Sequence, residues 1–114
     1  MNPRILRNLP REKAFYFFIS IGNYTGESAA SLKEFLEKIN EVNAKSLEFH
    51  LYRGDFEKWI ADVLEDKVLA EEMRKLQKIS LTGGTLRSQL YATVSKHYKN
   101  LMNQFSKKSN QEFF

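Results

Sequence analysis

The stretch AFYFFISIGN, residues 14–23, decides the fold, because its pattern is compatible with both a strand and a helix. Apolar residues occur at every second position from Phe15 to Ile21, and the stretch is rich in the aromatic and β-branched residues that strands favour. On the other side, Pro10 suits the first turn of a helix, and Gly22 would end that helix. The local pattern therefore leaves both conformations open.

A strand at residues 14–23 would need a second strand to pair with, and the rest of the chain offers only the short segment 79–81. This shortage favours a helix. We therefore predict an all-α fold, a compact bundle of about five helices, in which the N-terminal segment stays ambiguous between helix and strand.

Capping residues mark where several other helices begin. Ser31 and Glu34 fit a capping box, in which the hydroxyl and the carboxylate each accept a hydrogen bond from a free backbone N–H group. Ser46 can cap the next helix, and Asp66 can open a later one. Apolar residues follow each of them at helical spacing, so we expect a helix after each.

Glycines mark two joins between helices. Gly54 suits the residue after a helix and Asp55 suits the N-cap of the next, while the sequence leaves open whether Gly54 breaks or bends the helix. We predict that residues 82–85 form a loop that ends in Thr85, a further N-cap. From there we expect the longest helix, over about residues 86–105.

The length and composition are those of one compact domain. We expect a basic N-terminal arm at residues 1–9, a single helical domain at 10–105 and a polar C-terminal tail at 106–114. The chain has no cysteine, which excludes disulfides, thiolate catalysis, and iron–sulfur or cysteine-bound zinc sites. No apolar run is long enough to span a bilayer, and no secretory signal segment is recognisable. We therefore expect a cytoplasmic protein that does not act on membranes.

The net charge of +4 is distributed unevenly. Residues 1–13 carry +3, residues 14–73 carry −6 and residues 74–114 carry +7. Such asymmetry can mark an element that binds a polyanion, or two parts of a chain that pack together through complementary surfaces. Both interpretations stay open.

Residues 10–80 carry an ordered series of short motifs. In chain order these are YTGES at 24–28, SLKEF at 31–35, SLEFHL at 46–51, RGDF at 53–56, WI at 59–60, VL at 63–64 and LA at 69–70. The series resembles that of a family of small, largely archaeal proteins known only as a domain of unknown function, with the pattern TGxS…SLxEF…SLEFHLxRGDFxxWI…LA. In related sequences the position of Glu65 is often Gly. The resemblance implies a helical domain of archaeal or archaeal-like origin, and it supplies no reaction, substrate or site residues.

The first candidate site, for a ligand or a partner, lies within these motifs and comprises His50, Arg53, Asp55 and Trp59. A histidine beside an arginine and a carboxylate can bind an anion or carry a proton, and an exposed tryptophan can anchor a partner. The alternative is structural: Asp55 caps a helix, Arg53 pairs with an acid, His50 binds a backbone group and Trp59 belongs to the core.

The second candidate is an anion site at Gly83, Gly84, Thr85 and Arg87. Free N–H groups at a helix N-terminus attract phosphate, and glycines allow close approach. The segment lacks the spacing of a P-loop, so a plain turn between helices is the alternative.

The third candidate is a nucleic-acid-binding surface on the last helix and the tail. Its residues are Arg87, Lys96, Lys99, Lys107 and Lys108. The same side chains can instead face the acidic middle of the chain. No metal site is expected, because His50 and His97 lie far apart in the sequence, and no cofactor is expected.

The leading hypothesis from the sequence is a small non-enzymatic regulatory or adaptor domain that binds another protein of unknown identity. The alternative is a nucleic-acid-binding protein that uses the basic termini and the last helix. An enzyme with His50, Arg53 and Asp55 in a cleft ranks third. A homo-oligomer is compatible with the sequence, and the role of Phe113 and Phe114 stays open between disorder, docking and partner binding.

Overall fold

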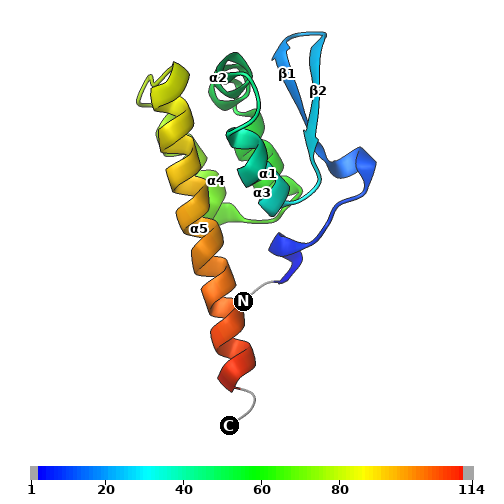
Figure 1. Cartoon of the computed structure of the whole chain (residues 1–114), viewed down its shortest axis with the longest axis vertical. Coiled ribbons are helices and arrows are strands. Elements are labelled where there is room, and N and C mark those ends of the chain that lie inside the picture. Colours follow the sequence, from blue (N-terminus) through cyan, green and yellow to red (C-terminus); the bar gives the residue numbers. More distant parts are fainter. Residues whose placement is uncertain (1–2, 112–114) are drawn as a thin grey trace.

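The computed structural model describes the backbone of residues 3–111 and the side chains of residues 4–105. Two short 3₁₀ turns, at Pro3–Leu6 and Arg11–Lys13, precede a β-hairpin and a series of helices (Figure 1). The strands are β1 (Phe15–Ser20) and β2 (Asn23–Ala29), and the helices are α1 (Leu32–Ile39), α2 (Ala44–Arg53), α3 (Asp55–Asp62), α4 (Lys67–Gln77) and α5 (Gly83–Gln111).

The prediction of an all-α fold is wrong, because β1 and β2 form an antiparallel hairpin and the fold is α+β. The strand that pairs with β1 is the next segment of the chain and not residues 79–81. Its sequence, NYTGESA, is mostly polar or small, so it carries no apolar strand pattern. Gly22, which suited the end of a helix, lies in the turn between the strands with a φ of +78°.

An aromatic core ties the hairpin to the helices. Phe15 and Phe17 are buried while Tyr16 between them is exposed, which is the period-two alternation of a strand with one covered face. Phe17 stacks on Phe35 of α1 with ring centroids 6.2 Å apart, and the Phe35 ring lies 5.0 Å from that of Phe56 in α3. The hairpin is therefore part of the core and not an appendage.

The helices separate the hairpin from the long C-terminal helix. In Figure 1 the hairpin lies on one side of α1, α2 and α3, and α5 lies on the other. The first half of α5 packs on this body, whereas its C-terminal turns extend beyond it. Strand β1 packs on α2, and this contact creates the site described below.

Residues 4–9, within the expected basic arm, pack on the domain. Ile5 and Leu9 belong to the hydrophobic core. The guanidinium of Arg4 forms an ion pair with Glu65, with 2.6 Å between Nη2 and Oε2. Part of the positive N-terminus is thus paired with the acidic middle of the chain.

Two of the predicted helix caps are confirmed. The Ser31 hydroxyl accepts a hydrogen bond from the Glu34 N–H at 3.1 Å, and the Glu34 carboxylate accepts one from the Ala30 N–H. The Asp66 carboxylate accepts a hydrogen bond from the Leu69 N–H at 3.0 Å, which opens α4.

Other boundaries differ from the prediction. Helix α2 begins at Ala44 with Asn43 as its cap, so Ser46 lies inside the first turn, buried, and its hydroxyl has no hydrogen-bond partner among the described residues. Gly54 breaks the helix, since it adopts a left-handed φ of +81° and separates α2 from α3. Asp55 is consequently the first residue of α3 and forms no side-chain cap.

Helix α5 is longer than predicted at both ends. It begins at Gly83, before the predicted cap Thr85, and its backbone continues to Gln111. Residues 106–111, within the expected polar tail, are therefore helical. The Phe113–Phe114 pair lies outside the described residues.

Candidate functional site

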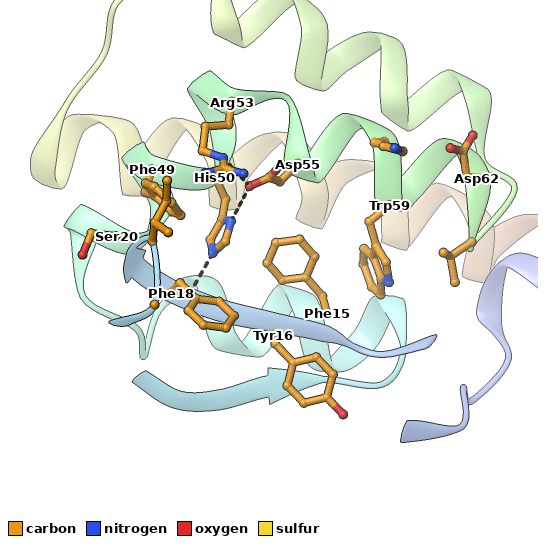
Figure 2. Close-up of a pocket in the computed structure, with 14 residues that line it drawn as sticks. Phe15, Tyr16, Phe18, Ser20, Phe49, His50, Arg53, Asp55, Trp59 and Asp62 are labelled. Atoms are coloured by element: carbon orange, nitrogen blue, oxygen red, sulfur yellow. Dashed lines mark hydrogen bonds and ion pairs between the residues drawn. The ribbon is translucent and has the colours of Figure 1, made fainter. Parts of the chain in front are cut away.

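A hollow of about 530 Å³ opens between β1, the C-terminal turn of α2 and α3 (Figure 2). We call it the β1–α3 groove. Apolar side chains form most of its wall: Phe15, Phe18, Ile21, Phe49, Trp59 and Val63. Several polar side chains also line it: His50, Arg53, Asp55, Lys58 and Asp62. All four residues of the first predicted site therefore lie in one groove.

The floor of the groove is a packed group of rings. The Phe15 ring lies 5.5 Å from the indole of Trp59 and 4.7 Å from the imidazole of His50, each in an edge-on arrangement. The Trp59 indole N–H donates a hydrogen bond to the Lys13 carbonyl at 2.8 Å. Trp59 is only 8% exposed, so it belongs to the core and to the groove wall at once.

His50 connects the hairpin to both helices of the groove. Its Nε2 accepts a hydrogen bond from the Phe18 backbone N–H, and its Nδ1 lies 2.8 Å from Oδ2 of Asp55. Because a backbone N–H can only donate, Nε2 carries the lone pair and the proton resides on Nδ1, which donates to Asp55. The ring is therefore neutral, and both of its nitrogens are engaged.

The surroundings of His50 lower its pKa below the ordinary value of a histidine. Burial is the main cause, since the residue is 4% exposed, and the nearby charge of Arg53 acts in the same direction. The hydrogen bond to Asp55 opposes this shift without overcoming it. A ring with no free nitrogen in this geometry is a structural link and is poorly suited to carry a proton to a substrate.

Arg53 is held in place from two sides at the mouth of the groove. Its Nε lies 3.2 Å from Oδ2 of Asp55, and its guanidinium lies over the Phe49 ring, 4.7 Å from the centroid. The side chain is nevertheless 49% exposed. Arg53 thus combines a fixed position with access to solvent.

The residues of the predicted anion site serve contacts within the domain. The Gly83 N–H at the start of α5 donates to the Glu48 carboxylate at 2.7 Å. Nη1 of Arg87 donates to the carbonyls of Ile39 and Val42, at 2.7 and 2.8 Å, just at and after the end of α1. An internal carboxylate therefore binds the N-terminus of α5, and Arg87 is engaged by two backbone carbonyls. Gly84 and Thr85 are exposed on the first turn of α5.

The predicted nucleic-acid surface is only partly assembled. Lys96 and Lys99 are exposed on α5, and neither forms an ion pair with a described carboxylate of the acidic middle of the chain. Arg87 does not join them, because it binds the carbonyls at the end of α1. The side chains of Lys107 and Lys108 lie outside the described part of the chain.

A second histidine–carboxylate pair links α4 to α5. Nε2 of His97 lies 2.5 Å from Oδ2 of Asp66, which is buried and also caps α4. Burial alone would raise the pKa of Asp66, but the hydrogen bonds from His97 and from backbone N–H groups lower it below its usual range. Within the described residues, no group of three or more His, Cys, Asp or Glu side chains is arranged to hold a metal ion.

The sequence does not identify the hairpin wall of the groove. Phe18 and Ile21 belong to the stretch whose pattern leaves strand and helix open and for which the sequence favours a helix, and their position beside the groove depends on the hairpin. Ile21 is 85% exposed at the tip, next to the groove. An apolar residue beside a Gly-Asn turn is the one local signal that favours such a hairpin tip.

Residues 10–114 match the model of a family of unknown function, DUF5752. Since this match covers most of the chain, the protein belongs to that family. No curated protein and no solved structure matches the chain. No helix within residues 3–111 is both long and apolar enough to cross a membrane.

Proposed function

We propose that this protein is a small adaptor domain that binds a partner protein by accepting apolar side chains of the partner in the β1–α3 groove. The observation that carries this proposal is an aromatic-floored groove continuous with exposed apolar residues of the hairpin. Buried aromatic anchors in such pockets supply most of the binding energy of protein interfaces. The cytoplasmic location expected from the sequence is part of the proposal.

The exposed apolar surface extends from the groove over the outer face of the hairpin. The Tyr16 and Tyr24 rings lie 6.0 Å apart, and the Phe18 ring lies 5.3 Å from that of Tyr24. Tyr16 and Tyr24 are exposed, and Ile21 is the most exposed large apolar residue of the hairpin. A contiguous exposed apolar patch beside a groove is typical of an interaction surface.

The groove is also preformed. The bond from the Phe18 N–H to His50 and the bond from Trp59 to the Lys13 carbonyl fix both walls relative to each other. A partner therefore loses little binding free energy to ordering of this surface.

Selection of peptides from a phage-displayed random library tests the proposal. We expect peptides that bind the wild-type domain and lose at least about tenfold in affinity when Ile21 is replaced by Glu, because one charge in an apolar interface costs 1.4 kcal/mol or more. Ile79→Glu is the matched control, since Ile79 is also an exposed isoleucine but does not line the groove. Selected peptides that tolerate Ile21→Glu and Ile79→Glu equally would contradict the proposal.

The exposed lysines of α5 support nucleic-acid binding as a second candidate function. Lys96 and Lys99 lie three residues apart on one helix face and are free to contact phosphates. Binding of single-stranded RNA should then weaken steeply with salt, and reversal of both charges to Glu should weaken it further. Binding that is absent, or insensitive to salt, would remove this candidate.

A further inference from the structure

We propose that the partner segment carries a carboxylate side chain next to its apolar anchors, and that Arg53 and Lys58 of the β1–α3 groove bind this carboxylate. The inference rests on the proposed function and names the chemistry of the partner. It assigns the groove to an acidic-apolar segment of a protein and not to a purely hydrophobic one.

Arg53 has the geometry of a prepared carboxylate receptor. Its stacking on Phe49 and its ion pair with Asp55 engage the face of the guanidinium and its Nε. Neither terminal nitrogen of Arg53 donates a hydrogen bond to a described residue. These terminal N–H groups form the planar fork that matches the two oxygens of a carboxylate.

Lys58 adds a second cation to the same groove. It is exposed, it lines the groove, and it forms no ion pair with a residue in the described part of the chain. Asp55 and Lys58 are three residues apart in α3, so their side chains leave the same face of the helix. Arg53, Lys58 and Asp55 together carry a net charge of +1, and Asp62 brings the charged side chains of the whole groove to a net charge of zero.

Two carboxylates of the groove oppose a negative ligand, and their positions decide where it binds. Asp55 already accepts the Nδ1–H of His50 and pairs with Arg53, which compensates its charge. Asp62 lies beyond Trp59, on the far side of that ring from Arg53 and Asp55 in Figure 2. The partner carboxylate is therefore expected at the Arg53 side, with the apolar anchors over Phe15 and Trp59.

The charge of the selected peptides tests the inference. A phage-displayed random hexapeptide library is selected in parallel on the wild-type domain, on Arg53→Gln, on Lys58→Gln and on the control Lys78→Gln. Lys78 is exposed and does not line the groove. We expect Asp and Glu to be enriched on the wild type and on the control, and the enrichment to be lost on the two groove variants.

A purified acidic peptide from the wild-type pool is then compared with its Asn or Gln analogue. The fluorescence of Trp59, the only tryptophan of the chain, reports binding directly in the groove. We expect about a tenfold preference for the acidic peptide, reduced to about twofold or less in Arg53→Gln and in Lys58→Gln. Lys58→Gln removes no ion pair to a described residue, so this variant tests the charge of Lys58 without breaking a salt bridge of the domain.

The outcomes separate the inference from the function on which it rests. Peptides that need Ile21 but carry no excess of Asp or Glu would overturn the inference and leave the adaptor proposal in place. Acidic enrichment that persists in both groove variants would overturn it as well. Selection that yields no Ile21-dependent peptide would overturn both the adaptor proposal and this inference.

Discussion

His50 shows how a residue with catalytic potential can be used for structure. Its imidazole accepts the Phe18 N–H of β1 and donates to Asp55 of α3, while its backbone belongs to α2. One side chain therefore joins three elements. A protonated ring cannot accept the Phe18 N–H, so the link exists only while His50 is neutral.

This link makes stability depend on pH in a defined direction. The pKa of His50 is lowered in the folded state, so the unfolded chain takes up a proton at a pH where the folded chain does not. The stabilisation is present above about pH 6.5, the pKa of an unperturbed histidine, and is lost as the pH falls from there toward the lower folded pKa. Urea unfolding of the wild type at pH 7.5, 6.5 and 5.5 should show this loss.

His50→Gln is the comparison that isolates the effect. A glutamine can accept the Phe18 N–H through its amide oxygen, but it does not titrate. We expect the free energy of unfolding of the variant to fall less between pH 7.5 and 5.5 than that of the wild type. Equal slopes in the two proteins would show that His50 does not contribute to the pH dependence.

At the scale of elements, helix termini are predictable wherever a side chain makes the decisive contact. Ser31 and Asp66 cap their helices as the sequence predicts, because each accepts a hydrogen bond from the backbone N–H three residues ahead. Ser46 does not, since Asn43 precedes it and accepts the Lys45 N–H at 2.8 Å. Asn and Ser are comparable N-caps, so the sequence alone does not decide between two such residues three positions apart.

The two glycines Gly54 and Gly84 give opposite expectations for substitution by alanine. Gly54 has a φ of +81°, and an added Cβ would lie 3.9 Å from its nearest neighbour, Nε2 of Gln77, so strain and not a clash opposes a side chain. We expect Gly54→Ala to lower the free energy of unfolding by about 1 kcal/mol. Gly84 has ordinary φ and open space in the first turn of α5, so Gly84→Ala should raise it by about 0.5 kcal/mol. Chemical denaturation measures both, and a neutral Gly54→Ala would contradict a required left-handed residue at the α2–α3 join.

At the scale of the molecule, one wall of the groove can be predicted from the sequence and the opposite wall cannot. Arg53, Asp55 and Trp59 lie within one short segment, so their proximity follows from the motifs. The opposite wall comes from β1, more than thirty residues earlier in the chain. Its position depends on pairing with β2, and the polar sequence of β2 does not predict a strand. The aromatic residues of β1 fit a buried helix and a strand equally well, and only the pairing with β2 decides between them.

The hairpin and the helices should unfold as one unit, because a two-stranded hairpin alone is marginally stable in water and this one supplies the centre of the core. Phe17 is fully buried and contacts rings of α1, α2 and α3. We expect Phe17→Ala to cost about 3–5 kcal/mol, a large share of the stability of a domain this size. Tyr16→Ala, next to it on the exposed face, should cost less than about 1 kcal/mol.

Two probes in one denaturation experiment decide whether the unit is cooperative. Far-ultraviolet circular dichroism follows mainly the helices, and the fluorescence of Trp59 follows the contact between α3 and the hairpin, through Phe15 and the Lys13 carbonyl. Coincident transitions in the wild type and in Tyr16→Ala, both shifted together by Phe17→Ala, are expected for a single cooperative unit. If fluorescence changed at lower denaturant than circular dichroism, the hairpin would detach before the helices unfold, and the groove would then be a mobile surface that a partner has to order.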